Sequence, residues 1–268
     1  MSEVRSIVEQ LTEVLDTGGR LLALMDFDGT LTPIVADPAK ARLSPTVRES
    51  LRVLSRDPRI KVGIISGRDL RDLRDRVGIA EVIYAGCHGL EVEGPGLAFL
   101  HPQAEARRET IQAIAAWLTR RAASVPGMSI EVKRLSAAVH YRHVSHRALS
   151  RLMVQIEQAL CQYPGSFKIL QGKKVIEILP HVGWNKGECA LWIRDYVFSD
   201  IRPAATMLYI GDDRTDEQAF LVLSDKAITA RVGGGEARSA SAYQLRDFAE
   251  VQRMLSALAA NVSGREAP

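Results

Sequence analysis

Two carboxylates directly follow a short apolar run. Asp26 and Asp28 come after LLALM at residues 21–25, a run typical of a strand buried on both faces of a parallel sheet. Ligands of such sheets bind beyond the carboxyl ends of the strands. Strand alternation points both aspartates the same way and turns Phe27 into the core, and Gly29 permits a sharp turn. Two such carboxylates could act as nucleophile and acid/base, although Asp-Gly alone is also an ordinary turn.

Two further polar segments suit an anion. Ser66 and Gly67 follow a second apolar run, KVGII at residues 61–65. A hydroxyl and the backbone N–H groups of a strand-to-helix turn can form an anion site. Lys186 begins a predicted helix, where the helix dipole disfavours a cation unless it serves an anion. Taken singly, a helix N-cap explains Ser66 and a solvated side chain explains Lys186.

An acidic cluster follows a third apolar run, MLYI at residues 207–210. Four acids within six residues suit a hard cation such as Mg²⁺, whereas helix capping explains one or two of them. These acids are Asp212, Asp213, Asp216 and Glu217. The acid pair, the hydroxyl, the lysine and this cluster each lie at the end of a predicted strand or the start of a predicted helix. Their combination indicates a single site rather than four accidents.

Strands alternate with helices in both outer parts of the chain, which predicts an α/β domain with a parallel sheet. A helix that begins at Pro45 has Ser44 as its N-cap. The predicted strands are 21–25, 61–65, 82–85, 206–210 and 226–230, and the other predicted helices cover about 1–17, 68–76, 186 onward, 213 onward and 247–260.

The pattern changes after the breaker Gly94-Pro95-Gly96. Two pairs of strands with very short connections read as hairpins, accompanied by two helices. The strands are predicted at 129–133, 137–143, 166–170 and 174–178, and the helices near 104–123 and 146–161. We therefore predict a discontinuous core domain, residues 1–95 and 183–268, with an inserted α+β domain at 96–182.

Composition excludes several classes of protein. The net charge of +3 is small and the charges are interleaved, so nucleic acid is not an expected partner. No apolar run approaches the ~20 residues of a membrane span, and acidic residues interrupt the N-terminal segment, which rules out a signal peptide. The three cysteines are widely spaced, which favours a reducing, cytoplasmic location.

The whole set of motifs resembles the haloacid dehalogenase superfamily, and more closely its trehalose-6-phosphate phosphatases. The motifs are DFDGTLTPIV at 26–35, SGR at 66–68, GCHGLE at 86–91 and GDDRTDEQAF at 211–220. Position 87 is more often a serine in that family than a cysteine. The resemblance implies a Rossmann-like parallel-sheet core with an inserted α+β cap domain. It also implies Mg²⁺-dependent hydrolysis of trehalose 6-phosphate through a phosphoaspartate.

The resemblance also implies residue roles. Asp26 is the nucleophile, Asp28 the acid/base, and Ser66 and Lys186 bind phosphoryl oxygens. The metal ligands are Asp26, the Asp28 carbonyl and Asp212, with Asp213 or Asp216 in support. The substrate-binding residues are Gly67, Arg68, His88, Gly89, Glu131, Lys133, His140, Arg142 and Glu177.

The inserted domain offers a physical reason for the last of these. Glu131 and Lys133 share a face of one predicted strand, and His140 and Arg142 share a face of the next. Carboxylates and ammonium groups bind sugar hydroxyls well, although cross-strand pairing on a wet sheet face explains the same residues.

Other functions compete with this prediction. A phosphatase for sucrose phosphate or a hexose phosphate would keep the same chemistry. A phosphomutase would need a second phosphate site, for which the inserted segment has no dense basic cluster. A catalytically silent sugar-phosphate-binding module would lack Asp26, Asp28 or Lys186, and all three are present. We expect a monomer without membrane contacts, with a trehalose-phosphate synthase as the candidate protein partner.

Overall fold

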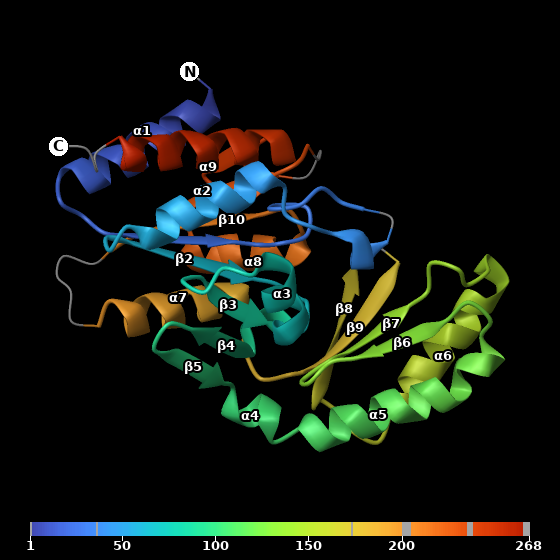
Figure 1. Ribbon diagram of the computed structural model, residues 1–268. Coiled ribbons are helices and arrows are strands. Elements are labelled where there is room, and N and C mark those ends of the chain that lie inside the picture. The colour runs from blue at the N-terminus through green and yellow to red at the C-terminus, as the bar shows by residue number, and fades with distance from the viewer. Residues whose placement is uncertain (1, 36, 173, 200–204, 235–237, 265–268) are drawn as a thin grey trace. The chain divides into compact units, whose positions relative to one another are not determined.

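The computed structural model describes residues 2–35, 37–172, 174–199, 205–234 and 238–264. The chain forms two compact units (Figure 1). The first, called the core unit below, comprises Met1–Phe99 and Asn185–Pro268, and the second, the inserted unit, comprises Leu100–Trp184. The sequence-based domain boundaries at 95/96 and 182/183 stay a prediction. None of the helices in the described parts of the chain combines the length and apolar character that a membrane span requires.

The core unit is built on one sheet in the order β12-β11-β10-β1-β2-β3-β4-β5. The pairs from β12 to β3 are parallel, as predicted, whereas β4 runs antiparallel to β3. The strands are β1 (Leu21–Met25), β2 (Ile60–Ile65), β3 (Ile83–Gly86), β4 (Glu91–Gly94), β5 (Leu97–Leu100), β10 (Thr206–Gly211), β11 (Ile228–Val232) and β12 (Tyr243–Leu245). Strands β4, β5 and β12 were not predicted. The breaker at 94–96 joins β4 to β5 instead of ending the sheet.

Strand β1 lies between β10 and β2, where the chain reverses its direction of travel across the sheet. The register aligns the ends of these three strands, because Met25 is opposite both Ile210 and Ile64. Ligands bind at such switch points in open α/β sheets. The residues that follow β1, β2 and β10 are the polar segments that the sequence singles out.

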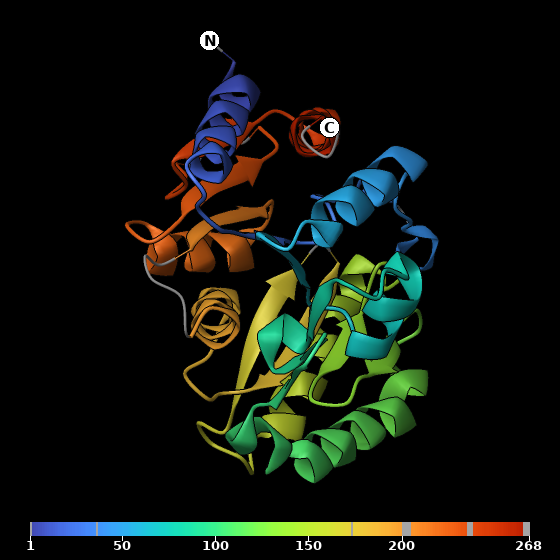
Figure 2. The ribbon, with the colours of Figure 1, turned by 60° about the vertical axis from the view of Figure 1, so that its left-hand side comes forward.

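Helices cover both faces of the core sheet (Figure 1). Helices α1, α2, α3 and α9 bury their apolar residues in one hydrophobic cluster with the sheet, and α9 lies between α1 and α2 (Figure 2). Helices α7 and α8 pack against each other on the opposite side. The bounds are α1 (Glu3–Asp16), α2 (Pro45–Arg56), α3 (Leu70–Val77), α7 (Lys186–Val197), α8 (Arg214–Leu223) and α9 (Phe248–Ser263).

Local capping explains where two of these helices begin. Ser44 Oγ accepts a hydrogen bond from the Val47 N–H group at 3.2 Å and Pro45 occupies the first turn, which confirms the predicted start of α2. The start predicted for α3 is wrong, because Asp69 caps this helix, accepting from Arg71 N–H at 3.0 Å. The residues 66–68 are therefore left as a connection between β2 and α3.

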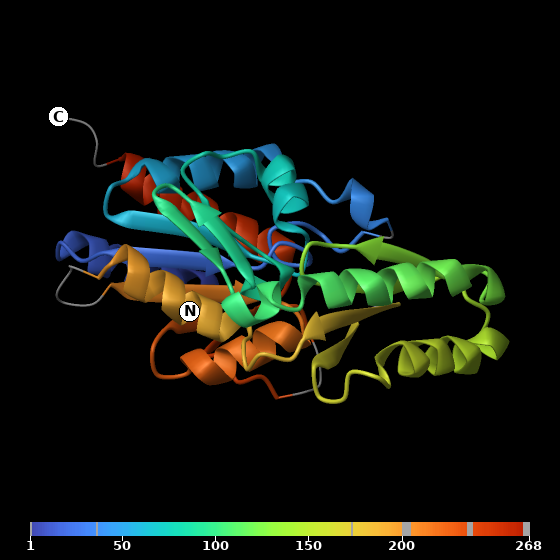
Figure 3. The ribbon, with the colours of Figure 1, turned by 90° about the horizontal axis from the view of Figure 1, so that it is seen from below.

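The inserted unit is an antiparallel sheet in the order β6-β7-β9-β8, and its two longer helices pack on one face (Figure 3). Both predicted hairpins are confirmed. The strands are β6 (Ser129–Val132), β7 (Ala137–His140), β8 (Phe167–Gly172) and β9 (Val175–Pro180), and the helices are α4 (Pro102–Glu105), α5 (Arg108–Arg121) and α6 (Leu149–Leu160), with short 3-10 turns at Ala122–Ser124 and His146–Ala148. Alternate strand residues such as Val139 and Ile176 pack on α5 and α6.

Candidate active site

The site in the core unit begins with Asp26, at the end of β1. Its N–H group donates to the Ile210 carbonyl of β10 at 2.8 Å, which extends the sheet by one more residue. Strand alternation then sends Phe27 into the hydrophobic core, as predicted. The Asp26 side chain is itself buried, with an exposed fraction of 6%. A buried carboxylate needs partners that offset its lost hydration.

Lys186 is the first of these partners. The Asn185 side chain accepts hydrogen bonds from the N–H groups of Gly187 (2.7 Å) and Glu188 (3.2 Å), which makes Lys186 the first residue of α7. The Lys186 ammonium group donates to Oδ1 of Asp26 and to Oδ1 of Asp216, both at 2.8 Å. The solvated-lysine interpretation is wrong, because the side chain is only 2% exposed.

Some acids of the cluster after β10 cap helix α8, and some face Asp26 and Lys186. Asp213 caps α8 and accepts hydrogen bonds from Thr215 N–H (2.7 Å) and Asp216 N–H (3.1 Å). Asp216 turns inward, where Oδ2 accepts from the N–H groups of Asp212 (3.0 Å) and Asp213 (3.1 Å). Its Oδ1 accepts from the Tyr209 hydroxyl at 2.8 Å as well as from Lys186. Asp213 and Asp216 thus form a capping box at the start of α8, so capping accounts for these two acids and does not account for Asp212.

Three carboxylates meet in this cluster. Asp26, Asp212 and Asp216 each offer an oxygen, and these oxygens lie within 4.8 Å of one another. Burial raises the pKa of Asp26 and of Asp216 above the usual range, against the attraction of Lys186. Burial and the neighbouring Asp216 and Asp213 raise the pKa of Asp212 to about 7. Burial alone would lower the pKa of Lys186, but the two carboxylates outweigh it and hold the pKa well above its usual value.

Burial is the largest cause of the raised pKa values of the three carboxyl groups, and repulsion from neighbouring carboxylates adds to it. Three carboxylates face one ammonium group, so two negative charges are left without compensation. Within the described residues, Asp212 Oδ1 is buried and accepts no hydrogen bond. Buried polar atoms in proteins are otherwise nearly always paired. The donor set of carboxylate oxygens and its charge fit a hard divalent cation such as Mg²⁺.

Gly29 lets the two acidic segments approach. It has φ +88°, a left-handed conformation that favours glycine, and a Cβ atom placed on it would overlap with the Asp212 carboxylate. A side chain at position 29 would therefore push Asp212 away from Asp26. Gly96 has a similar φ of +69°, but a Cβ atom there would meet no described atom within 4 Å.

This pair of glycines gives a prediction about stability. We expect Gly29→Ala to lower the free energy of unfolding by about 3 kcal/mol or more, against about 1 kcal/mol for Gly96→Ala. Both variants bear the cost of a left-handed alanine, and only the first adds a steric overlap. Urea denaturation of the two variants and the parent protein measures the difference. Equal losses would show that the Asp212 carboxylate moves aside freely.

Ser66 lies at the end of β2 and is buried, with an exposed fraction of 1%. Its N–H group donates to Ala85 O at 2.9 Å and its hydroxyl accepts from Arg68 N–H at 3.2 Å. Because Asp69 caps α3, the interpretation of Ser66 as a plain helix N-cap is wrong. Gly67 follows in the same turn. The hydroxyl remains a candidate donor to an anion.

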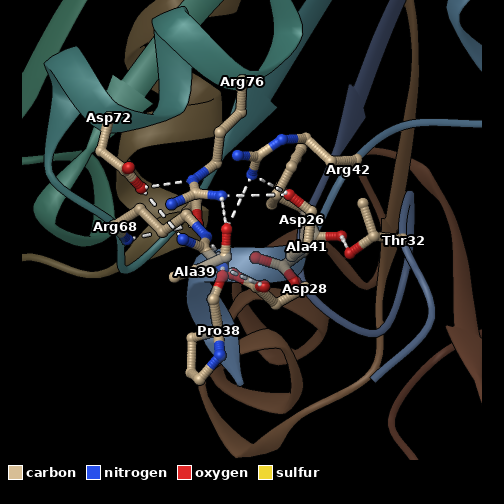
Figure 4. A network of polar contacts seen from close by, with 12 residues as sticks. Asp26, Asp28, Thr32, Pro38, Ala39, Ala41, Arg42, Arg68, Asp72 and Arg76 are labelled. Carbon is tan, nitrogen blue, oxygen red and sulfur yellow. Dashed lines mark hydrogen bonds and ion pairs between the residues drawn. The ribbon is translucent and has the colours of Figure 1, made fainter. Parts of the chain in front are cut away.

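Arg68 engages Asp28 (Figure 4). Its Nε donates to Asp28 Oδ2 at 2.6 Å and its Nη2 to Asp28 Oδ1 at 2.7 Å. The same guanidinium group also donates to Asp72 Oδ2 at 2.9 Å and to the Pro38 carbonyl at 2.8 Å. The predicted role of Arg68 in binding a substrate directly stays a prediction, and its observed partners are an aspartate pair and a backbone carbonyl.

The predicted residues His88 and Gly89 lie in the 3-10 turn Cys87–Gly89, beside Ser66. Three consecutive residues have positive φ, +49° at Cys87, +59° at His88 and +89° at Gly89. This conformation is costly for residues other than glycine, and it is held by hydrogen bonds from Cys87 N–H to Arg68 O (2.8 Å) and from His88 N–H to Ser66 O (2.9 Å). The turn thus ties β3 to the segment that carries Ser66.

The remaining predicted residues form contacts within the inserted unit. Lys133 Nζ donates to Glu177 Oε1 at 2.7 Å, and Glu131 Oε2 is 2.9 Å from His140 Nε2, a contact that lowers the pKa of Glu131. Glu131 and Glu177 both pair with Ala138, so they stand in one cross-strand row.

Two strand-face predictions in this unit are wrong. Strand β6 ends at Val132, and Lys133 lies in the turn with its N–H donating to Ser136 O at 3.0 Å. Strand β7 ends at His140, so Arg142 is an exposed turn residue and does not share a strand face with His140. Strand β6 ends where its hairpin turns at Lys133, and β7 ends at His140, whose partners Ser129 and Val175 are the end residues of the neighbouring strands.

Sequence reasoning missed three residues of the core-unit cluster. The Tyr209 hydroxyl donates a hydrogen bond to Asp216, and the Asn185 side chain caps the start of α7. Asp72 accepts a hydrogen bond from Arg68. Tyr209 had a signal, because its hydroxyl is the one polar side-chain group in the run MLYI. Asn185 before a predicted helix start was an N-cap signal. Asp72 had none, because it is one of several acids in a charged helix.

Comparisons with known proteins agree with the geometry. A family model described as trehalose-phosphatase matches residues 24–247. A trehalose-phosphate phosphatase of Mycobacterium tuberculosis is 34% identical over 247 residues, which cover 91% of this chain and 62% of that protein. A trehalose 6-phosphate phosphatase of Zea mays is 31% identical, over 93% of this chain and 72% of that protein. The chain thus spans less than two thirds of the mycobacterial relative.

Solved structures give the same fold. The C-terminal domain of a Candida albicans trehalose-6-phosphate phosphatase has a TM-score of 0.75 at 27% identity, covering 94% of this chain and 96% of that one. A trehalose-6-phosphate phosphatase related protein has a TM-score of 0.78 at 22% identity, covering 92% and 100%. A haloacid dehalogenase-like hydrolase from Bacteroides thetaiotaomicron has a TM-score of 0.57 at 15% identity, covering 88% and 98%.

Proposed function

Since the chain belongs to the trehalose-phosphatase family, we propose that it hydrolyses trehalose 6-phosphate to trehalose and phosphate. The observation that carries the chemistry is the buried cluster of Asp26, Lys186, Asp212 and Asp216 at the ends of β1 and β10. A fold alone does not fix an activity, but this cluster supplies a nucleophile, a cation for an anionic substrate and a set of metal ligands.

We propose Mg²⁺ as the cofactor. The orphaned oxygen of Asp212 and the uncompensated charge of the cluster support it. Asp26, Asp212 and Asp216, whose carboxylate oxygens lie within 4.8 Å of one another, would hold the ion with the Asp28 carbonyl. When bound, the ion would offset the repulsion between a phosphate dianion and an anionic nucleophile.

The protein residues then divide the reaction between them. Asp26 attacks phosphorus in line and forms a phosphoaspartate, while Lys186 and the Ser66 hydroxyl bind phosphoryl oxygens. Asp28 protonates the departing sugar oxygen. It then takes a proton from the water that hydrolyses the phosphoaspartate. Gly67 and the turn at His88 and Gly89 border the phosphate site.

The substrate assignment depends on the inserted unit. Glu131, His140, Lys133 and Glu177 supply charged acceptors and donors of the kind that bind a disaccharide's hydroxyl groups. The family relationship favours trehalose 6-phosphate over sucrose 6-phosphate or a hexose phosphate. We further propose a cytoplasmic monomer, and a trehalose-phosphate synthase as the partner to test for association.

The experiment that tests the function is phosphate release from a panel of sugar phosphates, with Mg²⁺ and with a chelator. We expect Mg²⁺-dependent release from trehalose 6-phosphate and little from glucose 6-phosphate or sucrose 6-phosphate. Phosphate release from the other sugar phosphates instead would agree with the Asp26 chemistry and contradict the proposed specificity for trehalose 6-phosphate. If no sugar phosphate in the panel releases phosphate, the result would favour a sugar-phosphate-binding module.

The metal site also predicts a dependence of stability on pH. The pKa of Asp212 is about 7 in the folded chain, raised by burial and by Asp216 and Asp213 from an ordinary 3.8. A carboxyl whose folded pKa is raised stabilises the fold below the unfolded pKa, and this contribution is lost as pH rises through the folded pKa. Without metal, raising the pH from about 5 to about 8 should therefore destabilise the parent protein more than Asp212→Asn.

Urea denaturation in a chelator at the two pH values measures this difference. Added Mg²⁺ should reverse the trend for the parent protein, because the ion binds the ionised carboxylates. It should do so far less for Asp212→Asn. If the free energy of unfolding changes equally with pH for the two proteins in the chelator, folding does not raise the pKa of Asp212.

A further inference from the structure

Arg68 makes a two-point contact with Asp28, the proposed acid/base. Both carboxylate oxygens accept from one guanidinium group, at 2.6 Å and 2.7 Å. Such a fork fixes the position of a carboxylate and the orientation of its plane together. It takes two of the roughly four acceptor positions of the carboxylate, which leaves the others for a proton.

Arg68 is anchored without the help of Asp28. Its guanidinium group also donates to Asp72 at 2.9 Å and to Pro38 O at 2.8 Å, and it lies 5.3 Å from the centre of the Phe27 ring. The side chain of Arg68 is 11% exposed, whereas that of Asp28 is 44% exposed. The arginine is therefore the fixed member of the pair, and the aspartate is the member that needs support.

A second arginine completes the anchor. Arg76 Nε donates to the same Asp72 oxygen at 2.7 Å, and its Nη1 donates to the carbonyls of Ala39 (3.0 Å) and Ala41 (3.1 Å) (Figure 4). Arg68 and Arg76 thus both donate to Asp72 Oδ2, and both also bind carbonyl groups of the segment after β1. Arg76 has the same exposed fraction, 11%, but its hydrogen bonds go to Asp72 and backbone carbonyls and not to Asp28.

From this arrangement we propose that Arg68 is a positioning residue for the acid/base Asp28. It aims the Asp28 carboxylate first at the sugar oxygen that leaves and then at the attacking water. The proposal rests on the proposed phosphatase function, and it gives Arg68 a role other than contact with the substrate. A free Asp28 side chain at this exposure would sample several rotamers, and each misaligned rotamer is lost to proton transfer.

Two substrates with different leaving groups test the proposal. Trehalose departs as an alkoxide that needs a proton, whereas p-nitrophenolate departs from p-nitrophenyl phosphate without one. In the first turnover, measured by rapid quench, we expect Arg68→Met to slow trehalose release at least ~20-fold and p-nitrophenolate release less than ~3-fold. Asp28→Asn should show the same preference for p-nitrophenyl phosphate, more strongly.

Two further variants keep the test falsifiable. Arg76→Met removes an equally buried arginine from the same anchor and should slow the two release rates by similar, small factors. Arg68→Lys keeps the charge but offers no fork, so it should show the substrate preference of Arg68→Met even where that variant folds poorly. Thermal melts of each variant report the structural cost separately.

The possible results distinguish a failure of the positioning role from a failure of the proposed function. Equal slowing of both substrates by Arg68→Met and Arg68→Lys would overturn the positioning role, as would no slowing. A rise in KM for both substrates, with the first-turnover rates unchanged at saturation, would make Arg68 a phosphate-binding residue instead and would also overturn it. If the parent protein hydrolyses neither substrate, the proposed function fails, and not this inference alone.

Discussion

Asp26→Asn is expected to lower turnover of trehalose 6-phosphate at least about 10⁴-fold, because the amide cannot attack phosphorus. The side chain is the one carboxylate of the cluster that directly follows β1, and its Oδ1 is 2.8 Å from Lys186 Nζ. Asp216 cannot replace it, because its oxygens already accept hydrogen bonds from Tyr209 and two backbone N–H groups. Single-turnover phosphate release with Mg²⁺ measures the effect.

The fold should survive this substitution. Asparagine keeps the shape of aspartate, and the Lys186 ammonium group keeps its contact with Asp216 at 2.8 Å. The variant loses the attraction between positions 26 and 186, but it also loses the burial cost of a carboxylate and the repulsion from Asp216 and Asp212, which together raise the pKa of Asp26 in the parent. We therefore expect melting temperatures in a chelator to agree within a few degrees. The exposed Asp225→Asn is the matched control for removal of one acid. Appreciable turnover by a folded Asp26→Asn protein would rule out Asp26 as the nucleophile.

The parts of the fold that local pattern determines could be predicted from the sequence. The buried strand at 21–25 was predicted with the bounds that the structure has, and the Ser44-capped helix was predicted with the observed start. The three polar segments after β1, β2 and β10 meet because parallel strands place their carboxyl ends at one edge of the sheet. Sequence order alone predicted this, since each motif follows its strand directly.

Features that depend on distant residues could not be predicted. The breaker at 94–96 joins two short strands of the core sheet, and only their pairing with β3 distinguishes them from a linker. Strand β12 has three residues, Tyr243–Leu245, too few for a periodic signal. The contacts of Arg68 with Asp28 and Asp72 could not be predicted either, because they join the segment after β1 to α3.

Lys186→Met is expected to lower the free energy of unfolding, measured in a chelator, by about 3–5 kcal/mol. The ammonium group lies between Asp26 and Asp216 and is 2% exposed. Its removal leaves buried carboxylates, already three in number, without a cation inside the cluster. Burial raises the pKa of Asp26 and Asp216 even with Lys186 present, and without Lys186 each ionised carboxylate costs more free energy. Urea denaturation measures the loss, and the exposed Lys226→Met is the control.

A second substitution in Lys186→Met should restore stability without restoring turnover. Lys186→Met should lower turnover at least about 10³-fold, because it removes a cation that binds the transferred phosphoryl group. Adding Asp216→Asn to it removes one of the unpaired charges, so part of the lost stability should return while turnover stays lost. Added Mg²⁺ should stabilise Lys186→Met more than the parent, since the ion then replaces the missing charge among the carboxylates. If Lys186→Met instead has the same melting temperature as the parent in the chelator, the carboxylates are not ionised in the metal-free cluster. In that case their charge no longer supports a divalent cation at this site.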